Sequence, residues 1–357
     1  MAWGSEESAA KGDVRAYYHR IRNLQKFAES QGHETVWQYS DEFKGKITLA
    51  PFCKKARLRE FLDSCDAVYL GATDCAAYAA SARKDGKGLI FDSHTPLIGE
   101  RLMYLKAEKT LRNLFLYFRS VFHESIAAKR CRVITTVSDS AIKYYQSTFR
   151  RSKEDVFLVR NAIDFLMFPA TPLPLGTKKR FAYTGGMEAW QGIPDLIEAY
   201  SQVRDIVELT LVGFLPHTQD LKKRAEDIGI AAFDSMPREK AMEHLAAAHF
   251  GVTATPAICG VHMPGAFPTK FAEYLAMNRA VMITRNYDCA KITEENNFGI
   301  VTHSGANGIA EGFRRAADLD FEQITDMAQR GRQWVIENCA IEVAGSIFLE
   351  AAKRACQ

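Results

Sequence analysis

The sequence has no cysteine pattern that would build a zinc site or a disulfide framework. Its 8 cysteines are scattered over 357 residues, without a Cys-x-x-Cys pair or a Cys/His cluster at zinc spacing. Scattered cysteines are typical of reduced thiols in a cytosolic protein. No stretch approaches the roughly 20 apolar residues that a membrane-spanning helix needs. The polar, acidic residues 1–7 are not typical of a signal peptide.

Charge of one sign is not in large excess either. The net charge of +3 is too small to indicate a nucleic-acid partner. The contents of 47% hydrophobic and 25% charged residues are ordinary for a soluble globular protein. A length of 357 residues favours two domains. We therefore expect a cytoplasmic protein, either free or peripheral to a membrane.

Short apolar runs alternate with helical patterns along the first half of the chain. Runs typical of strands lie at residues 34–39, 67–71, 88–92, 132–137 and 156–159. Helical spacing follows or precedes them, including one long helical region from about 99 to 129. Strands that alternate with helices predict βαβ units and a parallel sheet.

A Pro-rich segment, residues 170–177, interrupts this pattern and predicts an interdomain linker. The alternation then restarts, with strands expected at 180–184, 208–213, 250–255, 280–284 and 298–301. We predict an α/β protein with two Rossmann-like, doubly wound domains that face a cleft. The domains are residues 1–169 and 178–340, and a C-terminal helix at 341–357 packs back towards the first of them.

The stretch from Pro264 to Met277 combines a Gly/Pro loop with the start of a helix. Such a loop offers free backbone N–H groups and a positive helix end, which together bind anions and hydroxyls. Lys270 stands in the first turn and Glu273 one turn later. A cation and a carboxylate so placed suit a ligand that carries both phosphate and sugar.

Other polar or glycine positions follow predicted strands in the same way. His94, Gly185, Gly186 and Gly213 each come at or after a strand end, as does the loop 256–268. Ligands of doubly wound sheets bind outside the carboxyl ends of the strands. These positions are therefore expected to meet at one site.

The order and spacing of several motifs resemble a known enzyme family. In the second half the motifs are Tyr183-Thr184-Gly185-Gly186, residues 190–199, Leu211-Val212-Gly213, residues 268–277 and residues 297–301. In the first half they are Gly32-His33-Glu34, Asp92-Ser93-His94, Val137-Ser138 and residues 161–164. Together they resemble the retaining group 1 glycosyltransferases of the GT-B fold, over nearly the whole chain.

This resemblance implies a transferase of glycan biosynthesis. It would move a hexosyl-type sugar, with retained configuration and without metal or cofactor, from a nucleotide diphosphate sugar to an acceptor hydroxyl. The acceptor would be a glycan, a lipid-linked molecule or a small molecule. The family also begins with an apolar strand, whereas only 10 small or polar residues precede Lys11 here, so the first strand of the N-terminal domain is expected to be missing.

The resemblance assigns roles to the matching residues. Glu273 would bind the ribose hydroxyls, and Lys270 with the Thr269 amide would neutralise the leaving diphosphate. His94, the second catalytic residue beside Lys270, would line the sugar and acceptor site from the first domain. The other expected donor-binding positions are Gly12 and Asp13 at a helix start, Gly185 and Gly186, Gln191, His262, and the 265–267 backbone (Gly265, Ala266, Phe267).

Three positions depart from the family pattern. The family has two glutamates eight positions apart, and here Gly265 stands at the first position. Where the family commonly has an Arg and a Lys, this chain has Gly186 or Met187, and Gln191. Lys270 is therefore the one phosphate-binding cation left in a matching motif.

Two other functions remain open at this point. A nucleotide-sugar epimerase can use the same fold, and the missing cations also suit a catalytically silent nucleotide-sugar-binding protein. Separately, the basic and aromatic region 102–132 predicts either a helix on an anionic membrane or a long core helix with a solvated basic face.

Overall fold

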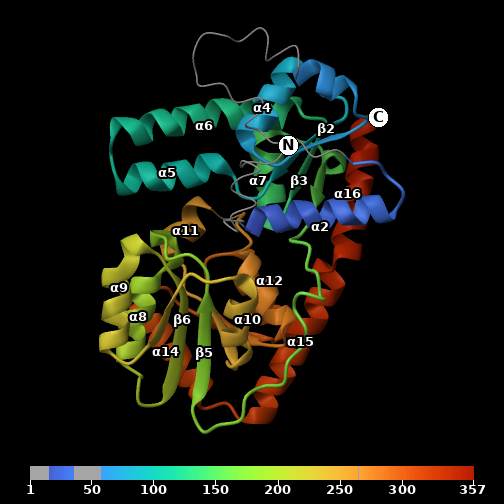
Figure 1. The fold of residues 1–357 in the computed structure, drawn as a ribbon. Coiled ribbons are helices and arrows are strands. Elements are labelled where there is room, and N and C mark those ends of the chain that lie inside the picture. The colour runs from blue at the N-terminus through green and yellow to red at the C-terminus, as the bar shows by residue number, and fades with distance from the viewer. Residues whose placement is uncertain (1–15, 36–57, 264) are drawn as a thin grey trace. The chain divides into compact units, whose positions relative to one another are not determined.

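The computed structural model of the chain describes residues 16–35, 58–263 and 265–357 (Figure 1). These residues form two compact units. Of these residues, the first unit comprises 16–35, 58–162, 265–267 and 341–357, and the second comprises 163–263 and 268–340. Gly12, Asp13 and nearly all of the strand expected at 34–39 lie outside the described residues, as does the expected absence of a first strand.

The first unit contains a parallel sheet in the order β1-β2-β3-β4. Its strands are β1 (Val68–Leu70), β2 (Leu89–Ser93), β3 (Val133–Thr136) and β4 (Val156–Leu158). The helices between them are α4 (Thr73–Ala82), α5 (Leu97–Ala107), α6 (Leu111–Arg130) and α7 (Asp139–Phe149). β2 and β3 are buried along their whole length, as expected for central strands of a parallel sheet.

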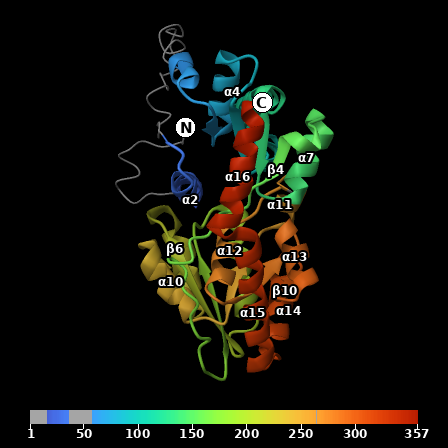
Figure 2. The same cartoon turned by 90° about the vertical axis from the view of Figure 1, so that its right-hand side faces the viewer.

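The last helix of the chain, α16 (Ile341–Cys356), belongs to this first unit. Ala351 and Ala355 pack against Ile90 and Val133 of the sheet. The Ala355 carbonyl also accepts a hydrogen bond of 2.7 Å from Gly88 N. α16 further contacts α2 (Ala16–Ser30) and β4, and Figure 2 shows its course beside β4.

One element of the first unit differs from expectation. The helical region expected from about 99 to 129 is divided, because the chain turns at residues 108–110 and forms the two helices α5 and α6. Glu108 is the C-cap of α5, and Thr110 caps α6 by accepting a hydrogen bond of 3.1 Å from Asn113 N. Threonine is a favoured N-cap residue, since its oxygen pairs a free amide of the first turn.

The second unit contains a six-stranded sheet in the order β10-β9-β8-β5-β6-β7, with all its pairs parallel. The strands are β5 (Lys179–Thr184), β6 (Val207–Phe214), β7 (Ala231–Asp234), β8 (Phe250–Thr253), β9 (Ala280–Thr284) and β10 (Gly299–Thr302). Its helices are α8 (Ile193–Ser201), α9 (Gln219–Asp227), α10 (Arg238–Ala246), α11 (Ala257–His262), α12 (Thr269–Ala276), α13 (Asp288–Asn296), α14 (Ala306–Ala317) and α15 (Phe321–Cys339).

The core of the second unit is formed by apolar residues from its central strands and the helices on them. Phe181 of β5 stacks on Phe250 of β8 at 5.0 Å and meets Phe313 of α14 edge-on at 4.7 Å. Two parallel α/β sheets of this kind confirm the predicted pair of Rossmann-like domains.

Candidate functional site

The sheet order of the second unit has a switch point between β5 and β8. From β5 the chain builds outward through β6 and β7, and then returns to add β8, β9 and β10 on the other side. In open α/β sheets, ligands bind beyond the carboxyl ends of the strands at such a point. The loops that follow β5 and β8 therefore define the candidate site.

Lys270, in the first turn of α12, points its ammonium group at residues near the end of β5 and in the segment after it. Its Nζ donates hydrogen bonds to the Tyr183 hydroxyl at 2.6 Å and to Gln191 Oε1 at 2.8 Å. The Tyr183 hydroxyl in turn donates to the Gly186 carbonyl at 2.5 Å. The structure thus brings together Lys270, Gln191 and Gly186, three of the predicted site residues.

Gly185 is fitted closely to this arrangement. Its φ of 142° disfavours a side chain, and a Cβ there would lie only 2.9 Å from Lys270 Nζ. Gly213 is close by, since a Cβ on it would lie 1.9 Å from the Gly185 carbonyl oxygen. Glycines at both positions let the backbone pass beside the ammonium group, which is what a phosphate site needs.

The environment of Lys270 makes its charge easy to lose. Burial lowers the pKa of Lys270 from 10.5 to about 7, although the negative charges of Glu188 and Glu273 oppose this effect. Burial also raises the pKa of Tyr183 well above its usual value, so the phenol keeps its proton and acts as a donor. A bound anion would favour the charged form of Lys270.

Glu273 lies one turn along α12 and is buried. Its carboxylate forms an ion pair with Arg238, the first residue of α10. Burial raises the pKa of Glu273, while the charges of Arg238 and Lys270 lower it. The Arg238 guanidinium also lies 4.8 Å from the ring centroid of Phe168. The Glu273 side chain is therefore buried and fixed by its ion pair, and it is not a solvent-exposed helix carboxylate.

Tyr274 fixes α12 against the sheet. Its hydroxyl accepts a hydrogen bond of 3.0 Å from Thr184 N at the end of β5. Its ring packs on β8 at Gly251, where a Cβ would lie 2.1 Å from the ring. This contact sets the position of the helix that carries both Lys270 and Glu273.

The remaining predicted residues of the second unit lie next to these elements. Thr269 is the first residue of α12, and His262 is the last residue of α11 and is buried. Their contacts with phosphate and sugar stay predictions.

The predicted backbone positions 265–267 belong to the first unit, although they lie within the sequence range 178–340 of the predicted second domain. The Gly265 carbonyl accepts a hydrogen bond of 2.9 Å from Ser138 Oγ. The Phe267 carbonyl accepts one of 3.0 Å from Asn161 Nδ2. Ala266 lies between them. These contacts use carbonyl groups, and the sugar-facing role of the amides stays a prediction.

His94 follows β2 in the first unit and is partly buried. Desolvation lowers the pKa of His94 to about 4, helped by the charge of Arg20 and opposed by that of Asp92. Asp92 itself accepts two hydrogen bonds from Arg20, at 3.0 and 3.3 Å, and one of 2.7 Å from Thr135 Oγ1. The imidazole is thus neutral at physiological pH, and Asp92 holds α2 to the sheet.

Sequence reasoning missed Arg238 and did not single out Tyr183. Arg238 was detectable only by its place, since helices that follow strands of a doubly wound sheet begin near the ligand. Over residues 16–35, 58–263 and 265–357, no three His, Cys, Asp or Glu side chains gather as they would around a metal ion.

The arrangement is a candidate site for an anionic ligand at the switch point of an α/β unit. Residues 178–318 match the model of the family described as glycosyl transferases group 1. Residues 178–318 therefore carry a group 1 glycosyltransferase domain, and the resemblance of the motifs to group 1 glycosyltransferases is confirmed. No curated protein sequence matches the chain.

Solved structures share the fold at low sequence identity. A glycosyltransferase from Rickettsia africae has a TM-score of 0.71 and 13% identity, covering 95% of this chain and 94% of its own. Sucrose-phosphate synthase from Thermosynechococcus elongatus has a TM-score of 0.69 and 14% identity, covering 93% and 92%. HepE from Anabaena, solved with UDP, has a TM-score of 0.65 and 15% identity, covering 84% and 82%. The predicted GT-B fold is thereby confirmed.

Proposed function

We propose that the protein is a retaining, metal-independent glycosyltransferase that moves a hexose from a nucleotide diphosphate sugar to an acceptor hydroxyl. The observation that carries this proposal is the meeting of Lys270, Gln191 and the Gly185-Gly186 turn at the switch point of a group 1 glycosyltransferase domain. The buried carboxylate of Glu273 lies one turn away on the same helix.

The nucleotide half of the donor is assigned to Glu273 and Lys270. A carboxylate can accept hydrogen bonds from both ribose hydroxyls. The ammonium group of Lys270 and the amide of Thr269 at the α12 N-terminus would neutralise the diphosphate. The ion pair with Arg238 favours the ionised form of Glu273 and would orient the carboxylate before the ribose arrives.

In the transfer step the bond from the anomeric carbon to the phosphate oxygen breaks, and the bond to the acceptor oxygen forms on the same face. The acceptor proton passes to the departing phosphate oxygen. Lys270 lowers the barrier by stabilising the charge that develops on the leaving diphosphate. His94, neutral and on the first unit, would contact the sugar and acceptor.

The acceptor is a glycan, a lipid-linked molecule or a small molecule with a free hydroxyl. We place the protein in the cytoplasm, free or peripheral to a membrane. The 8 scattered cysteines, without a Cys-x-x-Cys pair, suit a reducing compartment.

The proposal is tested by incubating the protein with a panel of nucleotide sugars and measuring nucleotide diphosphate release and donor binding. HepE was solved with UDP-glucose, so this donor is the first to test. The anomeric configuration of the product, read by NMR, tests retention, and a parallel assay with EDTA tests metal independence. We expect an α-configured product from an α-configured donor, at the same rate with EDTA.

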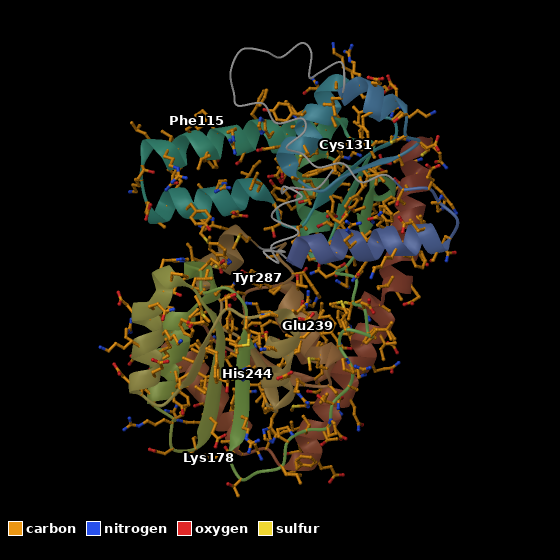
Figure 3. All side chains as sticks on the ribbon, viewed as in Figure 1. Phe115, Cys131, Lys178, Glu239, His244 and Tyr287 are labelled. Atoms are coloured by element: carbon orange, nitrogen blue, oxygen red, sulfur yellow. The ribbon has the colours of Figure 1, made fainter. Side chains whose placement is uncertain are left out.

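Glu273→Ala is expected to abolish donor binding. Glu239→Ala is the matched control, because this exposed neighbour lies on α10 and is marked in Figure 3. Binding without release, lost in Glu273→Ala, would instead indicate a silent binding protein. An epimerised nucleotide sugar as product would indicate an epimerase. Absence of binding to every donor would overturn the site assignment.

A further inference from the structure

The hairpin of α5 and α6 packs on the first unit with one face, and its other face carries exposed apolar side chains. α6 packs against α4 and α5, and its buried residues are Ser120, Glu124, Ala127 and Ala128. Glu124 accepts a hydrogen bond of 2.7 Å from Ile98 N and so ties α6 to the start of α5. Figure 1 shows the two helices lying antiparallel, with their connecting turn at the far end from the sheet.

The opposite face of α6 is apolar and exposed. Leu111 is 86% exposed, Phe115 62%, Phe118 61% and Phe122 64%. Their spacing of four, three and four residues puts all four on one narrow stripe of the helix. Figure 3 marks Phe115 on this helix. The core-helix interpretation of this region is therefore wrong for this face, because a core helix would bury its aromatic residues.

A contiguous apolar stripe of this kind normally meets a partner. Single exposed apolar side chains are common on soluble proteins, but three phenylalanines and a leucine in one row are not. Hydrating these four large apolar side chains is unfavourable in free energy, and covering them with a partner removes the unfavourable hydration. The identity of the partner is indicated by the charge of the hairpin.

The hairpin is strongly basic. Residues 97–130 contain seven Lys or Arg against three Glu, a net charge of +4, whereas the whole chain carries +3. One of those glutamates, Glu124, is buried. Lys106, Lys109 and Arg112 are exposed around the turn beside Leu111. The positive charge therefore lies next to the apolar stripe, as in helices that rest on anionic lipid.

We propose that the α5–α6 hairpin docks on an anionic membrane surface. The stripe of Leu111, Phe115, Phe118 and Phe122 enters the boundary between headgroups and acyl chains, and Lys106, Lys109 and Arg112 face the lipid phosphates. Over the described residues no helix is long and apolar enough to cross a bilayer, so the hairpin lies on the surface. Apolar insertion and basic attraction supply the two signals that stable anchoring requires.

The proposal is independent of sugar transfer, and its test needs no substrate. The full chain is sedimented with phosphatidylcholine vesicles, with and without about one third phosphatidylglycerol. We expect the protein to pellet with the anionic vesicles and to be released by high salt, which screens the basic residues. Failure to bind the anionic vesicles would overturn the proposal and leave the proposed transferase activity untouched.

Two sets of variants separate the two signals. The triple variant Leu111→Ser, Phe115→Ser and Phe118→Ser is expected to lower partition onto the vesicles at least about tenfold, because less apolar surface is buried in the membrane. Lys109→Gln with Arg112→Gln is expected to lower partition onto anionic vesicles by about tenfold or more. Neither set should lower binding to a soluble nucleoside diphosphate.

The matched control is Leu166→Ser with Leu175→Ser, which changes two exposed leucines of the second unit; Leu166 is 93% exposed. This control should pellet like the wild type. Equal loss in the control, or equal pelleting of all variants, would overturn the proposal. Light scattering decides the remaining case, since a wild-type dimer that the triple variant converts to monomer, without vesicle binding, would assign the stripe to a second copy.

Discussion

Arg238 and Glu273 form an ion pair that joins the first residue of α10 to the middle of α12. The Glu273 carboxylate is buried, and the Arg238 side chain is mostly covered. Burial raises the pKa of the Glu273 carboxyl, and the positive charge of Arg238 opposes this effect. Three predictions start from this pair and its neighbours in the second unit, and a fourth concerns His94 of the first unit.

Replacing Arg238 with Gln is expected to destabilise the fold by about 1–3 kcal/mol at pH 7, because Glu273 would keep a buried charge without its partner. The loss should shrink on acidification. Because the pKa of Glu273 is raised in the folded chain, the folded chain takes up this proton at a higher pH than the unfolded chain does. The stability lost at neutral pH therefore returns as the pH falls towards the pKa of Glu273 in the unfolded chain. Urea unfolding at pH 7 and pH 5 measures both effects. Arg238→Lys should retain most of the stability, and an equal loss at the two pH values would contradict the explanation.

Lys270 is expected to take up a proton when a nucleoside diphosphate binds. Its pKa of about 7 leaves much of it neutral above that pH, and the ligand charge raises this pKa. Affinity for the diphosphate should therefore fall by up to about tenfold per pH unit above neutrality. Calorimetry in buffers of different ionisation enthalpy counts the protons.

Lys270→Arg keeps its charge throughout this range and should bind without proton uptake. Lys178→Gln is a control for the loss of one exposed lysine charge, marked in Figure 3. Proton uptake that persists in Lys270→Arg would assign the titration to another group.

A side chain at residue 185 is expected to disturb both stability and binding. In Gly185→Ala the Cβ would meet Lys270 Nζ at 2.9 Å, on a backbone with φ of 142°. Backbone strain and the displaced ammonium group together should cost about 1–3 kcal/mol of stability and weaken diphosphate binding. Thermal unfolding and titration with the diphosphate measure the two effects.

Gly229→Ala provides the matched comparison, since Gly229 has φ of 89° but no atom within 4 Å of its added Cβ. It should lose stability through backbone strain alone and bind the diphosphate normally. Normal binding by Gly185→Ala as well would show that the close contact with Lys270 does not matter for the ligand.

His94 is expected to stay neutral at every pH where the enzyme would work. Its pKa is lowered to about 4, so the unfolded chain takes up a proton below 6.5 while the folded chain does not. The free energy of unfolding should therefore fall as the pH is lowered from 6.5 to about 4. It should fall less steeply in His94→Gln. Histidine NMR resonances give the midpoint directly. A midpoint near 6.5 would contradict the predicted environment.

The strands were predictable where burial was continuous. The apolar runs that became β2, β3, β5, β8 and β9 were found from the sequence, because strands covered on both faces consist mainly of apolar residues. β7 was not found. It is a short edge strand, Ala231–Asp234, and is mostly exposed, so it carries no apolar signal.

The site was predictable in its residues but not in its contacts. Lys270, Glu273 and the glycine turn were identified from motif order, since each occupies a recognisable place after a strand. The partners were not, because a hydrogen bond between Lys270 and Gln191 joins positions 79 residues apart. Arg238, 35 residues from Glu273, stands outside every motif. Long-range pairs of this kind depend on how the sheet is ordered.

The packing of α16 has a consequence for the order in which the chain is completed during synthesis. The first unit starts near the N-terminus, yet its sheet is covered by Ala351 and Ala355. These residues leave the ribosome after the whole second unit has been made. The second unit can thus fold while the chain is still growing, whereas the first keeps Ile90 and Val133 uncovered until α16 has been made. A chaperone that binds exposed apolar strands would therefore find the first unit available for longer than the second.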